Sequence, residues 1–152
     1  MQIRPYEPGD RDAVLEFAER LTIGVAAWRD AVAVRAAAEA WLRDSIDAIG
    51  DDGAVFVAEV GGALGGVVSV TTRRHFTGQA DAYVGELAVA EGVERRGVGR
   101  ALMRRAERWA WTRGLRCVSI ETGAANDGAR RFYENLGYTV EEVTMTRLLD
   151  GA

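Results

Sequence analysis

Residues 94–114 read ERRGVGRALMRRAERWAWTRG, and this stretch decides how the rest of the chain is interpreted. It follows the strand-like run ELAV, passes through Gly97 and Gly99, and continues into a helix-like run that Gly114 ends. The start of a helix presents unpaired backbone N–H groups and the positive end of the helix dipole, so an anion is favoured there. The pattern predicts a helix to about Arg113 with an anion-binding turn at its start.

The chemistry of this turn suits a pyrophosphate group. Gly97 and Gly99 lack a Cβ atom, so the backbone can approach a phosphate closely. Arg95, Arg96 and Arg100 add charge-assisted hydrogen bonds around the same point. Two familiar phosphate motifs are excluded, because the P-loop lysine and the third glycine of the dinucleotide fingerprint are both missing. An ordinary helix with a solvated arginine face remains the alternative.

The composition limits the class of protein. A chain of 152 residues with 48% hydrophobic and 28% charged residues fits one globular domain over residues 1–152. The net charge of −4 gives no reason to expect nucleic-acid or membrane-surface binding. Cys117 and His75 are the only cysteine and histidine, which excludes an intramolecular disulfide and zinc sites of the usual type. Without a signal-peptide pattern or a long apolar run, a cytoplasmic protein is expected.

The remaining pattern predicts an α+β (mixed α/β) fold, in which a mixed and mostly antiparallel sheet is flanked by about four helices. Glycines 61 and 62 separate two strand-like runs and predict a hairpin, because both tolerate a positive φ. The other expected elements are a strand at 3–6, helices at 11–21 and 30–49, a polar connection at 71–82, strands at 83–89 and 117–122, a helix at 126–137, and one or two closing strands at 138–149.

A second motif, NDGARRFYENLGY at residues 126–138, follows the glycine turn by some 25 residues. Together with LAV…ERRGVGRALM it resembles the GNAT superfamily of acyl-CoA-dependent N-acyltransferases. In that family a [Q/R]-x-x-G-x-[G/A] loop holds the coenzyme A pyrophosphate through backbone amides, and a later helix carries N-x-x-A-x-x-F-Y-x-x-x-G-[F/Y]. The positions that fit the second pattern are Asn126, Ala129, Phe132, Tyr133, Gly137 and Tyr138.

The resemblance implies a GNAT-like sheet and acetyl-CoA as the acyl donor, with no metal. It implies donor contacts at Leu87, Ala88, Val89, Arg95, Arg96, Gly97, Val98, Gly99, Arg100, Ala101, Asn126, Ala129 and Tyr133. One position departs from the family pattern, because Glu94 stands where the family has Gln or Arg. A carboxylate facing a pyrophosphate would repel it, so we expect Glu94 to point away and to pair with an arginine. Weaker coenzyme binding is the competing expectation.

Acyl transfer from a thioester to an amine needs a neutral amine, a polarised carbonyl and a protonated or stabilised thiolate. Tyr133 occupies the family position of the general acid, and packing onto the sheet is its alternative role. Glu86 is the first candidate for the general base, because an apolar neighbour raises the pKa of a carboxyl group. Its alternative role is an outward-facing acid on an alternating strand. Glu121 is the second candidate, and His75 a weaker one.

The leading hypothesis is therefore an N-acetyltransferase that moves the acetyl group of acetyl-CoA to a primary amine of a small molecule or peptide in a ternary complex. A non-catalytic acyl-CoA-binding sensor is the alternative from another class, and the Glu94 departure is its support. A nucleic-acid-binding domain that uses the arginine-rich helix is a third alternative, and it predicts salt-dependent binding to DNA or RNA. No nucleic-acid or membrane partner is expected, and a homodimer is allowed by analogy with the family.

Overall fold

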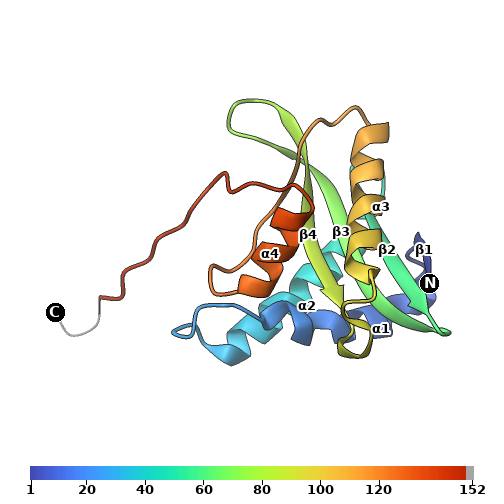
Figure 1. Ribbon diagram of the computed structural model, residues 1–152, viewed down its shortest axis with the longest axis horizontal. Coiled ribbons are helices and arrows are strands. Elements are labelled where there is room, and N and C mark those ends of the chain that lie inside the picture. The colour runs from blue at the N-terminus through green and yellow to red at the C-terminus, as the bar shows by residue number, and fades with distance from the viewer. Residues whose placement is uncertain (150–152) are drawn as a thin grey trace.

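The computed structural model describes residues 1–149, which form a five-stranded sheet with helices on both faces (Figure 1). The strands lie side by side in chain order, namely β1 (Gln2–Pro5), β2 (Gly53–Val60), β3 (Ala63–Arg74), β4 (Ala80–Val89) and β5 (Val118–Ile120). Neighbouring strands are antiparallel except β4 and β5, which are parallel. The helices are α1 (Arg11–Leu15), α2 (Ala31–Asp47), α3 (Val98–Thr112) and α4 (Asp127–Asn135), with 3₁₀ turns η1 (Pro8–Asp10), η2 (Glu16–Thr22) and η3 (Glu91–Val93). The predicted α+β fold is confirmed.

The helices bury a separate apolar core on each face of the sheet. On one face, α3 and α4 contribute Leu102, Met103, Ala106, Trp109, Ala110 and Tyr133 to the core. On the other face, α1, η2 and α2 contribute Val14, Phe17, Ala18, Ala38, Leu42 and Ile46. Burying one large aliphatic side chain contributes about 1.5–3 kcal/mol. The apolar stripes of the helices therefore hold the sheet between two layers.

The arginines of α3 lie mostly away from the core. Arg104 and Arg108 are exposed, whereas the guanidinium of Arg105 stacks 4.1 Å from the ring centroid of Phe56. The middle of the helix thus has the solvated arginine face that the sequence allowed. Among residues 1–149, no helix is both long and apolar enough to cross a membrane.

Two hairpins connect the central strands. The β2–β3 turn has Gly61 and Gly62 at φ 60° and 82°, as the glycine pair predicted. The β3–β4 hairpin is longer than expected, because the predicted polar connection at 71–82 is mostly strand. Arg73 pairs in register with Asp81 and stacks 3.8 Å from the ring centroid of Tyr83. These cross-strand contacts stabilise a ribbon whose residues are too polar to be recognised as strand from sequence.

The helix predicted at 11–21 ends early. It is α-helical only to Leu15 and continues as the 3₁₀ turn η2. A 3₁₀ helix aligns residues three apart, so Phe17 and Arg20 follow one another along the same side. Phe17 is buried in the core beneath α2, and Arg20 reaches the end of β4.

The C-terminal strands predicted at 138–149 are absent from the described structure. Residues 139–149 are exposed, take no part in a strand, and lead away from the body of the molecule (Figure 1). Val143 and Met145 expose 76% and 91% of their surface. The alternation of apolar and polar residues favours a strand, but a strand also requires a neighbour for its backbone groups. Within this chain the segment does not meet one.

Candidate functional site

The first turn of α3 presents backbone N–H groups without helical partners. Gly97 precedes the helix with φ of 81° and ψ of 6°, a left-handed conformation that favours glycine. No side chain caps this end, and the N–H groups of Val98, Gly99 and Arg100 have no helical partner. Ala101 donates its N–H to the carbonyl of Gly97 at 3.0 Å, so of the amides predicted to bind the donor at this turn, that of Ala101 is already paired. Arg95, Arg96 and Arg100 are exposed here, and none pairs with a carboxylate of residues 1–149. The turn therefore has the donors and the charge that an anion requires.

Gly99 also allows close packing between elements of the protein. A Cβ atom at this position would lie 3.2 Å from Cζ of Phe132 on α4 and 3.6 Å from Cγ2 of Val89 on β4. The glycine therefore allows α3, α4 and the end of β4 to approach closely. It brings the three elements of the candidate site together and does not simply open the backbone to a ligand.

The outer edge of β4 is unpaired beside this turn. β5 pairs with β4 only from Ala82 to Val84, whereas β4 continues to Val89. After Ile120 the chain leaves the sheet and leads to α4 (Figure 1). The last part of β4 is thus an open edge between the start of α3 and α4.

The main-chain groups along this edge point alternately toward and away from β3. Ala90 donates its N–H to the carbonyl of Gly65 at 2.9 Å. Because bonded pairs alternate in an antiparallel ladder, Ala88 is the next residue bonded to β3, and Leu87 and Val89 direct their N–H and C=O groups outward. Of the three residues predicted to bind the donor through the main chain, Leu87 presents a free N–H and a free C=O, and Ala88 presents neither. Val89 presents a free N–H, but its carbonyl accepts a hydrogen bond from Arg20 Nε at 3.1 Å.

A β-bulge moves Glu86 to the α2 face of the sheet. The β3–β4 register shifts around Ser69, so that Gly85 and Glu86 both lie opposite this one residue. Before the shift Val84 packs in the core beneath α3, and after it Ala88 packs in the core beneath α2. Glu86 therefore points into the α2 layer, close to the open edge of β4.

Glu86 is only 5% exposed, and hydroxyl groups surround its carboxylate. Ser45 of α2 donates to Oε2 at 2.7 Å, Ser69 donates to the same oxygen, and the Glu86 N–H donates to Ser69 Oγ at 3.0 Å. Burial raises the pKa of Glu86, while the serine hydrogen bonds oppose the shift by favouring the charged form. Sequence reasoning missed both serines, although Ser69 is conspicuous as the only polar residue of GGVVSV.

Glu94 pairs with an arginine, as expected, but its partner is remote in sequence. Arg20 of η2 bonds to Glu94 Oε1 through Nη2 and donates from Nε to the carbonyl of Val89 at 3.1 Å. The acidic side chain that departs from the family pattern is thereby neutralised beside the glycine turn. The same guanidinium connects η2 to the open edge of β4. No sequence signal pointed to Arg20.

The start of α4 is fixed by Asn126. Its Oδ1 accepts the N–H of Ala129 at 3.1 Å and so caps the helix, and its Nδ2 donates to the carbonyl of Ile23 at 3.3 Å. The two loops touch closely here, since a Cβ on Gly24 would lie 2.3 Å from Cβ of Asn126. The amide group is thus engaged in holding α4 against the η2–α2 loop.

Tyr133 lies on the opposite face of the sheet from Glu86, in the core beneath α3 and α4. Its ring packs edge-on against Phe132 and Tyr138, and its hydroxyl has no hydrogen-bond partner among residues 1–149. Burial raises the pKa of Tyr133 above its ordinary value, so the phenol stays protonated at neutral pH. The hydroxyl of Tyr138, by contrast, donates to Glu107 Oε1 at 3.0 Å.

Two weaker candidates lie elsewhere. Glu121 follows β5, is exposed, and pairs with Arg73 at 3.1 Å. His75 lies in the β3–β4 loop, at the opposite end of β4 from the glycine turn. Ten residues of strand at about 3.3 Å each separate the two ends. The structure does not bring His75 to the site.

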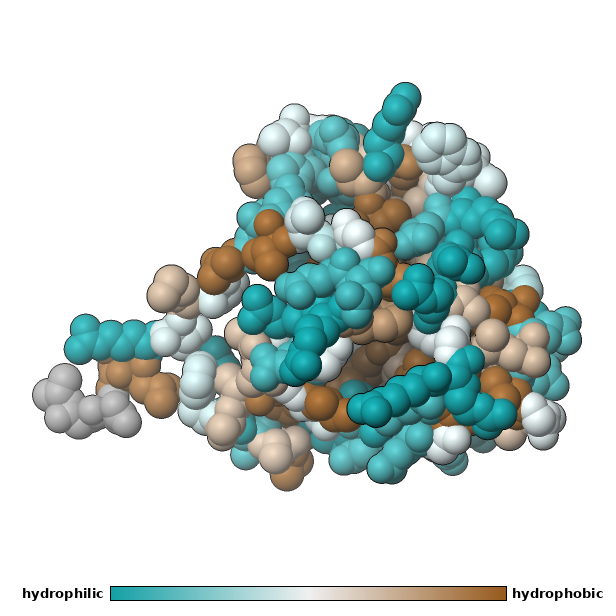
Figure 2. Space-filling model, in the orientation of Figure 1, coloured by the Kyte–Doolittle hydropathy of each residue, from teal (hydrophilic) through white to brown (hydrophobic). Residues whose placement is uncertain are grey.

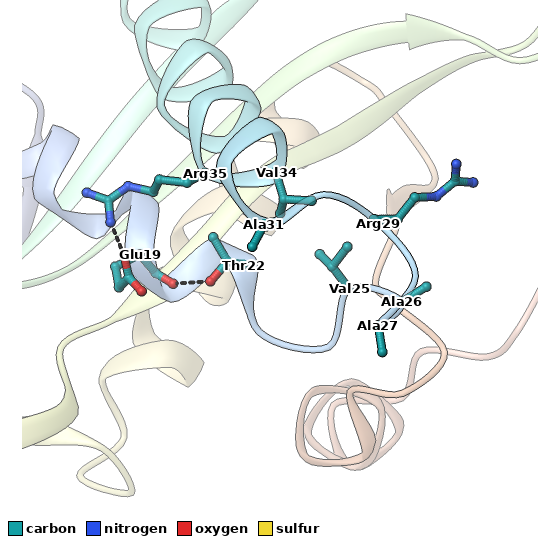
Figure 3. A pocket seen from close by; sticks show the side chains of 9 residues that line it. All are labelled: Glu19, Thr22, Val25, Ala26, Ala27, Arg29, Ala31, Val34 and Arg35. Atoms are coloured by element: carbon teal, nitrogen blue, oxygen red, sulfur yellow. Dashed lines mark hydrogen bonds and ion pairs between the residues drawn. The ribbon is translucent and has the colours of Figure 1, made fainter.

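The surface is hollowed at two places, one between α3 and α4 and one between η2 and the start of α2. Figure 2 shows that the face bearing α3 and α4 is hollowed between them, with a hydrophobic floor and a hydrophilic rim. A pocket of about 280 Å³ lies between η2 and the start of α2, where an ion pair joins Glu19 and Arg35 (Figure 3). Its other lining residues are Thr22, Val25, Ala26, Ala27, Arg29, Ala31 and Val34.

Known structures share this fold. The aminoglycoside 6'-N-acetyltransferase AAC(6')-IG of Acinetobacter haemolyticus aligns with a TM-score of 0.73 and 17% identity, covering 99% of this chain and 100% of that protein. A tetramutant of the BH1408 protein of Bacillus halodurans aligns with a TM-score of 0.80 and 17% identity, covering 98% and 100%. At such low identity these similarities establish the fold alone.

Sequence comparison gives the family. N-acetyltransferase MJ1207 of Methanocaldococcus jannaschii, itself uncharacterized, is 34% identical over 95 residues, which are 61% of this chain. The match spans only 42% of that relative's length. The model of the acetyltransferase (GNAT) family matches residues 14–138, which include the glycine turn, the open edge of β4 and α4. The chain therefore belongs to the GNAT acetyltransferase family.

Proposed function

We propose that residues 1–152 are one N-acetyltransferase domain, which moves the acetyl group of acetyl-CoA to a primary amine of a small molecule or peptide. The observation that carries this proposal is the junction of the α3 turn, the open edge of β4 and Tyr133. Membership in the GNAT family supports acetyl transfer, and the free N–H groups and unpaired arginines support a donor that carries a pyrophosphate.

The chain's residues fit such a donor in a simple arrangement. The amides of 96–100, with the side chains of Arg95, Arg96 and Arg100, would hold the pyrophosphate. The outward main-chain groups of Leu87 and the N–H of Val89 would pair with the amides of the pantetheine arm, which would add to the sheet as a strand does. The arm would then run along the open edge of β4 toward Glu86. Asn126 and Ala129 would border the arm from α4.

The proposed reaction is direct attack of the amine on the thioester carbonyl. The C–N bond forms, the C–S bond breaks, and coenzyme A leaves as the thiol. Glu86, whose pKa is raised by burial, would accept the proton of the amine directly or through water. Tyr133, which stays protonated, would give its proton to the leaving sulfur. The two groups lie on opposite faces of the sheet, so the open edge of β4 is where a thioester could meet both.

The acceptor is proposed only as a primary amine. The protein from Acinetobacter haemolyticus is named for an aminoglycoside, whereas this chain's pocket beside η2 is lined by one acidic side chain, Glu19, and two basic ones, Arg29 and Arg35. Glu19 is already paired with Arg35, so the pocket does not favour a cationic acceptor.

The alternative function, a non-catalytic acyl-CoA sensor, is favoured by Glu94 alone, and the ion pair with Arg20 weakens that argument. The two functions are distinguished by mixing the protein with acetyl-CoA and a panel of amines and measuring thiol release. Amine-dependent release is expected. Binding of acetyl-CoA without release across a broad panel would instead favour the sensor.

The hydroxyl of Tyr133 can be tested by Tyr133→Phe. If the phenol is the general acid, kcat falls about 100-fold while the Kd for acetyl-CoA changes little, because a general acid acts in the transition state. Steady-state kinetics and calorimetric titration measure the two quantities. Tyr138→Phe is the matched control, since it removes a hydroxyl that bonds to Glu107. Equal kinetic effects of the two variants would return Tyr133 to a packing role.

The Arg20–Glu94 pair should control donor affinity. Arg20→Gln leaves a carboxylate without its partner beside the proposed pyrophosphate, so we expect the Kd for acetyl-CoA to rise about fivefold, in the range of a partly exposed charge. Glu94→Gln removes that carboxylate, and we expect Kd to stay the same or fall. Arg43→Gln, which breaks the exposed pair with Glu39 on α2, is the control. Undiminished binding by Arg20→Gln would contradict the assignment.

Glu86 should make stability depend on pH. A carboxyl group whose pKa is raised by folding contributes stability fully below its unfolded pKa of about 4.3, and this is lost as pH rises through the higher folded value. The variant Glu86→Gln has no carboxyl group at this position and so does not lose this stability as the pH rises. Chemical denaturation between pH 4 and 8 should therefore show that the unfolding free energy of the variant, relative to that of the wild type, increases with pH.

The exposed Glu16→Gln provides the control for this measurement, and we expect no pH-dependent difference from it. The catalytic role has a separate readout, because Glu86→Gln should flatten the acidic limb of the pH–rate profile if Glu86 is the base. A constant stability difference across the pH range would contradict the raised pKa, whatever the kinetics.

A further inference from the structure

Two of the three serines of this chain bond to one carboxylate oxygen. Ser45 of α2 and Ser69 of β3 both donate to Oε2 of Glu86, although 41 and 17 positions of sequence separate them from it. The third serine, Ser119 of β5, donates instead to the carbonyl of Ala82 at 3.4 Å. A helix and a strand thus each contribute one hydroxyl group to the same buried oxygen.

The direction of the Ser69 hydrogen bond is fixed by its surroundings. Its Oγ accepts the N–H of Glu86 at 3.0 Å, so its single hydrogen is left for Oε2 of the same residue. Ser69 is only 2% exposed, so water hardly competes for this hydrogen. A Cβ atom at Gly85 would lie 2.9 Å from the Oγ, so the glycine leaves the space that the hydroxyl group occupies. Ser69 therefore holds both the backbone and the side chain of Glu86.

The other carboxylate oxygen of Glu86 is left free. Oε1 accepts no hydrogen bond from residues 1–149, since both serines donate to Oε2. It is not sealed from solvent either. In this part of the chain the only wholly buried side-chain nitrogen or oxygen without a partner is Nε2 of His75. The protein therefore holds one oxygen of the carboxylate and leaves the other open.

A proton on Oε1 leaves both serine hydrogen bonds intact. In the carboxylate, Oε2 accepts the two hydroxyl groups through its lone pairs. A proton on Oε2 would occupy one of these sites, and one serine would lose its acceptor. When Oε1 takes the proton instead, Oε2 becomes the carbonyl oxygen of the neutral acid and still accepts both bonds. The arrangement is thus satisfied before and after proton transfer at Oε1.

We propose that Ser45 and Ser69 are positioning residues, which hold Oε2 of Glu86 so that Oε1 takes the proton of the acceptor amine. The inference rests on the proposed function. In this step the N–H bond breaks with its electron pair left on nitrogen, and an O–H bond forms at Oε1, directly or through one water. The side chain keeps its orientation while its charge changes, because both serines stay bonded. The proton then passes from Oε1 to solvent.

The groups around Glu86 determine what the serines do to its titration. Burial raises the pKa of Glu86, the two serine hydrogen bonds lower it, and Asp44 of α2 raises it. Tyr83 of β4 stays neutral near pH 7, because burial raises its pKa. Arg20 of η2 is engaged in its own ion pair, and β3 faces the carboxylate with the uncharged Ser69. Loss of either hydroxyl group should therefore raise the pKa of Glu86 further.

The first test needs neither donor nor acceptor. The ¹³C-labelled side-chain carboxyl of Glu86, identified by its absence in Glu86→Gln, is titrated by NMR. We expect Ser45→Ala and Ser69→Ala to titrate at higher pH than the wild type, because each loses a hydrogen bond to the charged form. Ser45→Thr keeps the hydroxyl group, and Ser119→Ala removes one that does not touch Glu86, so both should titrate as the wild type does.

The half-buried Ser45 keeps this test decisive even if Ser69→Ala folds poorly, which circular dichroism would reveal. Unshifted titration in Ser45→Ala overturns the inference, and so does an equal shift in Ser119→Ala.

The second test is the kcat of each variant divided by that of the wild type, with the same amine at every pH so that its own titration cancels. For Ser45→Ala we expect this ratio to fall about fivefold from pH 8 to pH 5, in the range of one hydrogen bond to a charged group. For Ser45→Thr it should stay constant. A constant ratio for Ser45→Ala overturns the inference and leaves the proposed function intact. A wild type that releases no thiol with any amine overturns the proposed function, and the positioning role with it.

Discussion

The early end of the β4–β5 pairing is the constraint on which the site depends. Backbone N–H and C=O groups need partners, and beyond Val84 the outer edge of β4 has no strand beside it. The bulge at Ser69 then sends Glu86 to one face, while the outward main-chain groups of Leu87 and Val89 stay at the edge. This unpaired part of β4 has backbone groups that can hydrogen-bond to an extended ligand. The free N–H groups at the start of α3 lie next to it and can bind an anion.

Close packing keeps this edge in place. Gly99 allows α3 to touch Phe132 and Val89, and Gly24 allows the η2–α2 loop to touch Asn126. The contact at Gly24 is closer than a side chain would tolerate, and a side chain at Gly99 would force Phe132 to shift, so these glycines allow the close distances between the elements. The guanidinium of Arg20 adds a polar connection at the same edge, because it bonds to both Val89 and Glu94. This one side chain therefore fixes η2 to both the end of β4 and the loop before α3.

Local signals in the sequence predicted much of this arrangement. The paired glycines at 61–62 have the left-handed φ that their turn requires, and the helix predicted from the glycine turn to about Arg113 is α3, from Val98 to Thr112. Interactions between distant residues could not be predicted. Arg20 and Glu94 are 74 residues apart, and the serines around Glu86 come from two other elements. Residues 139–149 have the sequence pattern of a strand, but the pattern does not provide the neighbouring strand that pairing requires.

Amide hydrogen exchange with and without acetyl-CoA tests whether the α3 turn and the open edge of β4 hold the acyl donor. We expect added acetyl-CoA to slow exchange at the amides of 96–100 and at Leu87 and Val89, while Ala88, already bonded to β3, and Ala101, already bonded to Gly97, change little. Unchanged exchange at both the turn and the edge, under conditions where acetyl-CoA binds, would show that the donor binds elsewhere.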